Sequence, residues 1–177
     1  MKRRRAEIDI NDILADVVAV TEHTLSLSHI ITKLACEPEL PPIVGDPEKL
    51  RQVFVNLINN AHHAMQEHGG QLNLVSGFDR DRQMVTVTVR DTGHGIDEKN
   101  QARIFDPFFT TKPVGQGTGL GLSVSYGIIH EHGGTIEVES PVPGERQTEQ
   151  PGTQFVIRLP VADQRHDDEP TQGSTAA

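Results

Sequence analysis

The stretch from Asp91 to Ser123 reads DTGHGIDEKNQARIFDPFFTTKPVGQGTGLGLS, and the interpretation of the whole chain starts from it. It contains two glycine-rich segments, residues 91–95 (DTGHG) and 115–121 (GQGTGLG). The preceding residues 84–89 (MVTVTV) alternate and are rich in β-branched side chains, which predicts a strand. A strand that ends in an acid can bind the edge of a base, and a glycine-rich segment that opens a helix can bind phosphates through backbone N–H groups. The stretch therefore predicts a nucleotide site.

The composition excludes several classes of protein. Sixteen basic and 25 acidic residues give a net charge of −9, and Trp is absent, which together argue against a nucleic-acid surface. The single cysteine, Cys36, permits no intrachain disulfide and fits a reducing compartment, so a cytoplasmic location is expected. No run approaches the ~20 apolar residues of a membrane span, so no membrane contact by this fragment is expected.

The order of the predicted elements gives the fold class. Strands are predicted at residues 7–10, 29–36, 71–77, 83–90, 135–140 and 153–159. Helices are predicted at residues 47–68, 97–103 and 119–132. A further helix is predicted to follow a cap at Asn11, and its apolar stripe consists of Ile13, Leu14, Val17, Val18 and Leu25. Because strands come partly in neighbouring pairs, this order predicts an α/β two-layer sandwich with one mixed sheet and helices on one face.

The chain length and its irregular parts predict the domain organisation. The 177 residues suit one folded domain, which we expect at residues 8–161. The basic run within residues 1–7 is interpreted as the stub of a preceding helical region. Residues 37–45 carry three prolines and are predicted to be a loop. Residues 162–177 are polar without periodicity and are expected to be a disordered tail.

The helix predicted at 47–68 carries Asn56, Asn60 and His63 on one flank of its apolar stripe, at helical spacing. An Asn side-chain oxygen is a suitable ligand for Mg²⁺, which completes its shell with water and phosphate oxygens. His63 could then contact phosphate. The alternatives are that the asparagines hydrogen-bond to neighbouring backbone and that His63 is an ordinary surface side chain near a helix end.

The predicted nucleotide site has an acidic end and a glycine-rich end. The Asp91 carboxylate can accept a hydrogen bond from an exocyclic amine and select adenine over guanine; the alternative is a turn or capping acid. Gly93 and Gly95 allow the backbone to approach a flat ring closely. Glycines 117, 119 and 121 cost about 1 kcal/mol each in the first turns of a helix, so we interpret them as a phosphate-binding segment. No Gly-Lys-Ser/Thr follows, so the segment is not a P-loop.

Four motifs resemble those of one family. Residues 56–61 (NLINNA) resemble the N box, 91–95 the G1 box, 105–111 (FDPFFTT) the F box and 117–122 (GTGLGL) the G2 box. In order and spacing they resemble the catalytic ATP-binding domain of two-component sensor histidine kinases, in the Bergerat-fold (GHKL) group. The resemblance covers residues 8 to 160, and the FFTTK wording is most similar to nitrogen- and dicarboxylate-sensor kinases. It implies a flexible lid over ATP.

The resemblance implies ATP and Mg²⁺ as cofactors and assigns roles to matching positions. Asp91 would bind the adenine amine with support from Thr153, and Asn60 would coordinate Mg²⁺. Phe105, Phe108 and Phe109 would be apolar hinge anchors of the lid. The remaining nucleotide contacts implied are Asn56, His63, Gly93, Gly95, Ile96, Phe105, Thr110, Thr111, Lys112, Gly117, Thr118, Gly119, Leu120 and Gly121. Among these, Asn56, His63 and Lys112 are the expected catalytic group.

The residue four positions before Asn60 indicates which reaction to expect. Water-hydrolysing relatives have a Glu general base there, whereas this chain has Asn56, which cannot take a proton at neutral pH. Transfer to an acceptor is therefore favoured over hydrolysis. The resemblance implies an acceptor His that is followed by an acid and, soon after, by Asn-Pro, and this chain has no such sequence. The resemblance therefore implies an acceptor on a separate helical dimerisation domain and a response regulator as a further partner. It also implies a dimer only in the full-length kinase and no autophosphorylation by this chain alone. The alternatives are a non-catalytic nucleotide-sensing module and a GHKL-type ATPase.

Overall fold

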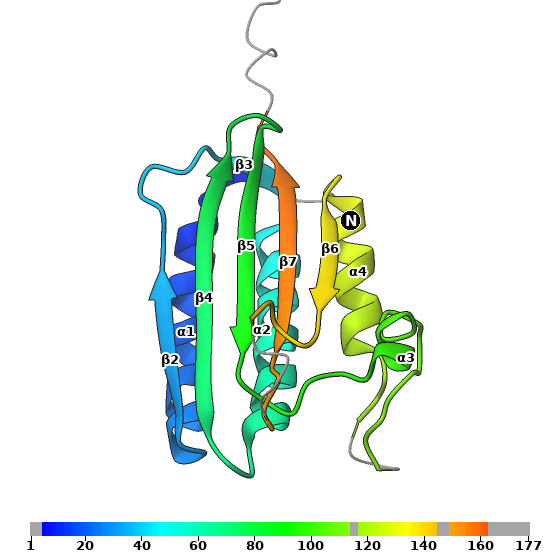
Figure 1. Ribbon diagram of the computed structural model, residues 1–177. Helices are drawn as coiled ribbons and strands as arrows, with labels where there is room; N and C mark the ends of the chain where they lie inside the picture. Colours follow the sequence, from blue (N-terminus) through cyan, green and yellow to red (C-terminus); the bar gives the residue numbers. More distant parts are fainter. Residues whose placement is uncertain (1–4, 114–116, 145–148, 163–177) are drawn as a thin grey trace, which may run out of the picture.

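The computed structural model describes residues 5–113, 117–144 and 149–162. Its main feature is a five-stranded sheet in the order β2-β4-β5-β7-β6, with helices packed on one face (Figure 1). The strands are β2 (Ile30–Ala35), β4 (Gly70–Asp79), β5 (Met84–Asp91), β6 (Thr135–Glu139) and β7 (Thr153–Pro160). β2 runs parallel to β4 and the other neighbours are antiparallel, so the sheet is mixed. The predicted two-layer α/β class is confirmed.

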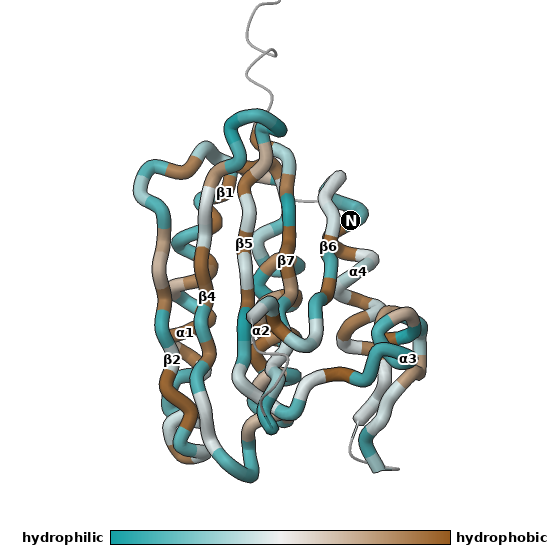
Figure 2. Tube along the Cα trace, in the orientation of Figure 1, coloured by the Kyte–Doolittle hydropathy of each residue, from teal (hydrophilic) through white to brown (hydrophobic). Residues whose placement is uncertain are grey.

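The core lies between this sheet and helices α1 (Ile10–Leu27), α2 (Pro47–Met65) and α4 (Gly121–Glu131). Figure 2 shows apolar and polar residues alternating along the strands, because successive side chains of a strand point to opposite faces. Val85, Val87 and Val89 of β5 are buried accordingly. The apolar stripe of α2 faces them and consists of Leu50, Val53, Phe54, Leu57, Ile58, Ala61 and Met65.

The beginnings of the two long helices show one correct prediction and one wrong one. Asp46 caps α2 and accepts hydrogen bonds from the backbone N–H groups of Glu48 and Lys49, as expected, although the helix ends at Met65. The cap of α1 is Asp9, not Asn11, because the Asp9 carboxylate accepts from the backbone N–H of Asn11. The Asn11 amide is used elsewhere, donating to the Glu37 carbonyl at 2.8 Å.

A second, two-stranded sheet was not predicted. β1 (Ala6–Ile8) pairs with β3 (Ile43–Gly45), so the predicted loop at residues 37–45 ends in a strand. Val161 forms a bridge with Ile43, and the N–H of Ala162 donates to the Pro42 carbonyl. The folded part therefore continues through residue 162. The tail predicted beyond it, and residues 1–4 of the basic stub, lie outside the described residues.

Two other predicted helices are shorter than expected. The segment predicted at 97–103 forms only the one-turn helix α3 (Glu98–Gln101). The helix predicted from residue 119 begins at Gly121, so residues 117 and 119 lie before it and only one of the three glycines is helical. Among the described residues, no helix is long and apolar enough to cross a membrane.

Candidate functional site

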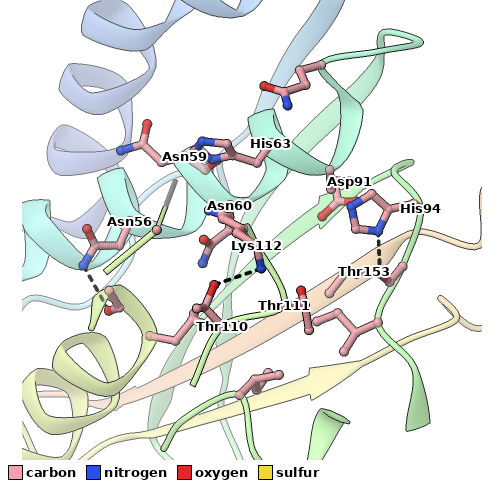
Figure 3. Close-up of a pocket in the computed structure, with 18 of the residues that line it drawn as sticks. Asn56, Asn59, Asn60, His63, Asp91, His94, Thr110, Thr111, Lys112 and Thr153 are labelled. Carbon is pink, nitrogen blue, oxygen red and sulfur yellow. Dashed lines mark hydrogen bonds between the residues drawn. The ribbon is translucent and has the colours of Figure 1, made fainter. Parts of the chain in front are cut away.

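A cavity of about 670 Å³ opens between the C-terminal half of α2, the end of β5, the start of β7, and residues 109–113 and 117–122 (Figure 3). Its volume lies in the range of small-molecule sites. The cavity brings together most of the predicted site residues: Asn56, Asn60, His63, Asp91, Gly95, Ile96, Thr110, Thr111, Lys112, Gly117, Thr118, Gly119, Gly121 and Thr153. Gly93, Phe105 and Leu120 do not line it.

Asp91 provides an acidic group at one end of the cavity. It is the last residue of β5 and only 5% exposed, and its Oδ1 accepts a hydrogen bond from the Gly93 N–H at 2.8 Å. Burial raises the pKa of Asp91 to about 6, although hydrogen bonds from the backbone N–H groups of Gly93 and Thr153 and the nearby His94 oppose this shift. Thr153 thus supports Asp91 through its backbone. At neutral pH the carboxylate is ionised and can accept a further hydrogen bond from a ligand.

Glycines in the turn after β5 pack against the protein itself. A Cβ on Gly93 would lie 2.6 Å from the Ala64 Cβ on α2, and one on Gly95 would lie 2.8 Å from Pro151. Gly95 also has a φ of 76°, which favours glycine. Gly95 lines the cavity, where the predicted contact with a ring remains a prediction, whereas Gly93 does not line it and allows the turn to approach α2.

The two asparagines of α2 differ in their contacts. The Asn56 amide donates to the Gly121 carbonyl at 3.1 Å and to Ser125 Oγ at 3.2 Å, so it joins α2 to the start of α4. Asn60 Nδ2 is buried and has no hydrogen-bond partner in the described part of the chain. An unpartnered buried amide is costly and is common where a ligand completes the site. Asn60 thus has an unused N–H donor, whereas Asn56 partly fits the alternative of backbone contact.

Two of the basic side chains that line the cavity, His63 and Lys112, were predicted to contact phosphate or to belong to the lid. His63 is exposed on α2, and its Nδ1 lies 2.7 Å from the Asn59 carbonyl. Because a carbonyl can only accept, Nδ1 carries the proton. Lys112 is half-buried among the lining residues, and burial lowers the pKa of its ammonium group. Both side chains lie on the side of the cavity where Asn60 is found (Figure 3).

The glycine segment before α4 is held in place by the F-box region. The Phe108 N–H donates to the Gly119 carbonyl at 2.9 Å, and a Cβ on Gly119 would lie 2.7 Å from the Phe108 Cα. Gly119 has a φ of 66°, so both the space and the conformation require glycine. Leu120, the N-cap of α4, has no side-chain acceptor for the first N–H groups of the helix. The start of α4 can therefore bind an anion.

The three phenylalanines of the F-box region do not share one role. Phe105 and Phe109 are partly buried and pack against the core, and the Phe105 ring lies 5.4 Å from Tyr126. Phe108 is 74% exposed, so its side chain is not the apolar anchor that was predicted.

Several lining residues were not predicted. They are Asn59, Ala64, Gln66, Glu67, His68, His94, Ile104, Phe109, Pro113, Leu122, Gln150 and Phe155. Ala64 could have been found, because it lies one turn after Asn60 on α2, whereas Gln66, Glu67 and His68 follow the end of the helix. Gln150 and Phe155 come from a distant part of the sequence, and no local pattern marks them.

Comparison with known families and sequences gives consistent matches. The family described as "Histidine kinase-, DNA gyrase B-, and HSP90-like ATPase" matches residues 45–163. Sporulation kinase E of Bacillus subtilis is 37% identical over 166 residues, covering 92% of this chain and 21% of that protein. Sensor kinase CckA of Brucella abortus is 39% identical, covering 92% of this chain and 18% of that protein. The chain thus spans about a fifth of the length of these curated relatives.

Solved structures match over most of the chain. Full-length ShkA in complex with AMPPNP gives a TM-score of 0.76 at 27% identity, covering 92% of this chain and 32% of that one. The catalytic domain of histidine kinase ThkA gives 0.75 at 31% identity, covering 91% of this chain and 99% of that one. ThkA in complex with response regulator protein TrrA gives 0.70 at 27% identity, covering 89% of this chain and 42% of that one.

Proposed function

The chain belongs to the family of histidine kinase-, DNA gyrase B- and HSP90-like ATPases, as the ATP-binding catalytic domain of a sensor histidine kinase, and from this premise we propose how it acts within a longer protein. It binds Mg·ATP and transfers the γ-phosphoryl group to a histidine on a separate helical dimerisation domain. The observation that carries this proposal is the cavity that has the Asp91 carboxylate at one end and Asn60, with its unpartnered Nδ2, further along it (Figure 3).

The adenine end of the proposed site rests on Asp91. Its buried carboxylate accepts from the exocyclic amine, while the Gly93 and Thr153 N–H groups hold its position. The relative ShkA was solved with AMPPNP, an ATP analogue, which supports ATP as the nucleotide. Ile96, Ile104 and Phe155 add apolar surface to the lining. A carboxylate that is partly desolvated and already oriented selects a donor strongly.

The phosphate end rests on Asn60, the start of α4 and Lys112. The residues fit a magnesium ion that is held mainly by phosphate oxygens and water, because Asn60 carries one amide oxygen at the cavity and no group of three His, Cys, Asp or Glu side chains in the described part of the chain could hold a metal. When bound, Mg²⁺ would neutralise charge on the triphosphate. Lys112 and the N–H groups of α4 add positive charge.

Transfer is preferred over hydrolysis because the cavity wall at Asn56 holds no base. Its amide donates to the Gly121 carbonyl and to Ser125, which leaves it a structural link between α2 and α4. The acceptor and its base would come from the helical domain. A response regulator is the proposed next partner, supported by the complex of the relative ThkA with TrrA. Use of ATP as donor supports a cytoplasmic location.

Phosphotransfer is tested by mixing the chain with ATP labelled on its γ-phosphate and a helical phosphoacceptor domain of a sensor kinase. We expect acid-labile label on the acceptor, none on the chain alone, and little free phosphate. Label appearing mainly as inorganic phosphate would favour the ATPase alternative. ATP binding without label on the acceptor would favour the nucleotide-sensing module.

The pKa of Asp91 predicts a pH dependence of base binding. A value of about 6 means that lowering the pH from 7 to 5 protonates most of the carboxylate, which then loses its charge as an acceptor. We expect the affinity for adenosine to fall about tenfold between pH 7 and pH 5. Adenosine is the probe because it has no phosphate to titrate. An affinity that is constant over this range would contradict the assignment of Asp91 to the base.

A further inference from the structure

Two polar side chains outside the cavity lining connect the parts of its base-binding wall. Ser140 follows β6 and is 9% exposed; its Oγ accepts from the Ile96 N–H at 2.8 Å and donates to the Gly152 carbonyl at 2.8 Å. Gln101 of α3 donates from the same Nε2 to the Ile96 carbonyl at 3.0 Å and to the Ser140 carbonyl. We call Ser140 and Gln101 the clamp.

The clamp acts on both segments that hold Asp91. Ile96 continues the turn that begins with Gly93, whose N–H donates to the Asp91 carboxylate. Gly152 precedes Thr153, which pairs with Asp91 in the β5–β7 ladder and donates to the same carboxylate. The Gly152 N–H also donates directly to the Gly93 carbonyl at 2.9 Å, so a backbone hydrogen bond joins the same two segments. The two donors to Asp91 thus come from segments that Ser140 joins.

The packing around Gly95 shows that the turn after β5 lies in close contact with Ser140 and Pro151. A Cβ on Gly95 would lie 2.9 Å from Ser140 Oγ and 2.8 Å from Pro151, so the turn lies directly on the connection between β6 and β7. The phosphate end depends on other contacts, those of Asn56 with Gly121 and Ser125. A change in the clamp should therefore affect the base end of the cavity and leave the phosphate end intact.

We propose that Ser140 and Gln101 are positioning residues that set the preference for adenine by holding the Gly95–Ile96 segment and the start of β7 against each other around Asp91. The inference rests on the proposed nucleotide site and goes beyond it. Neither residue has to touch the base. Without these two side chains the N–H groups of Gly93 and Thr153 could move apart. The Asp91 carboxylate would then no longer be oriented to accept a hydrogen bond from the exocyclic amine.

The test compares the dissociation constants of Mg·ATP and Mg·GTP for the 177-residue chain and its variants. Guanine has a carbonyl where adenine has the exocyclic amine. GTP therefore cannot donate a hydrogen bond to Asp91 from this position, and its affinity should not depend on the orientation of the carboxylate. We expect Ser140→Ala to raise the Kd for ATP about tenfold and that for GTP by less than about twofold. Gln101→Leu, on a short surface helix, should show the same pattern more weakly, and Ser140→Thr should restore the ATP preference because it keeps the hydroxyl.

Ser76→Ala is the matched control. Ser76 is also buried, accepts from a backbone N–H, that of Glu37, and donates to an oxygen, that of Asn11, but it does not line the cavity. We expect it to lower thermal stability and leave the ATP-to-GTP ratio unchanged. The inference is overturned if Ser140→Ala and Gln101→Leu keep the wild-type ratio, or if Ser76→Ala changes it equally. Failure of the wild-type chain to bind ATP at all would instead refute the proposed function, and the inference with it.

Discussion

Asp91→Asn is expected to weaken ATP binding by at least about 100-fold and at the same time to stabilise the nucleotide-free domain at neutral pH. The asparagine oxygen can still accept a hydrogen bond from the Gly93 N–H, whose nitrogen lies 2.8 Å from Asp91 Oδ1 in the wild-type chain. Its NH₂ group would then face the exocyclic amine, so two donors would meet where a donor and an acceptor are needed. The loss therefore exceeds that of one surface hydrogen bond.

The gain in stability follows from the direction of the pKa shift. Burial raises the pKa of Asp91 from 3.8 to about 6, so between these values the folded state binds a proton that the unfolded state has lost. The free energy of unfolding contributed by this group is present below pH 4 and is lost as the pH rises through 6. The shift corresponds to about 2–3 kcal/mol. Asparagine carries no charge, so it avoids this loss.

Thermal or denaturant unfolding at pH 4 and pH 7.5 measures this effect, together with calorimetric ATP titration. Asp79→Asn is the matched control, because Asp79 ends β4 at the other end of the β4–β5 pair and is half-buried. We expect no loss of ATP affinity in that variant. A domain that Asp91→Asn destabilises equally at both pH values would contradict the assigned shift.

Asn60→Ala is expected to lower the rate of phosphoryl transfer by about 100- to 1000-fold and to remove the effect of Mg²⁺ on ATP affinity. The alanine removes both amide atoms of Asn60: the oxygen, which is the proposed metal ligand, and the buried Nδ2, which has no partner in the described part of the chain. Since the buried Nδ2 makes no hydrogen bond, its removal should change the free energy of unfolding by less than about 1 kcal/mol.

The decisive measurement is ATP affinity with Mg²⁺ and with a chelator. The wild-type chain should bind more tightly with Mg²⁺, and the Asn60→Ala variant should bind equally in both conditions. Asn73→Ala serves as control, because Asn73 lies on β4 and does not line the cavity. If the variant kept the full response to Mg²⁺, Asn60 would not be the metal ligand.

The parts of the fold that follow from sequence are those with strong local patterns. The alternation in residues 84–89 is reproduced in the burial of Val85, Val87 and Val89. Asp46 and Pro47 fix the start of α2, because one caps the helix and the other suits its first turn. The order of four motifs predicted that residues distant in sequence share one site, and most of them line the cavity.

The remaining features depend on contacts between distant residues. Asp9 and Asn11 are both good caps, but the Asn11 side chain is engaged by the Glu37 carbonyl and by Ser76, so Asp9 caps the helix. The three-residue strands β1 and β3 are too short for a periodic signal. Phe108 is exposed and its backbone N–H bonds to Gly119, eleven residues away, and the clamp joins residues 96, 101, 140 and 152, so local patterns could not indicate either.

The short strand β3 has a mechanical consequence. Ile43 pairs with Ile8 on one side and with Val161 on the other, so both ends of the folded part are fastened to one strand. The Val161 N–H also bonds to Gln83, next to the residue at which β5 begins, whereas Asp91 is where β5 ends. A pulling force transmitted from flanking segments would load the same few backbone bonds, a full strand length away from Asp91. The bound base would be shielded from that tension until those bonds break.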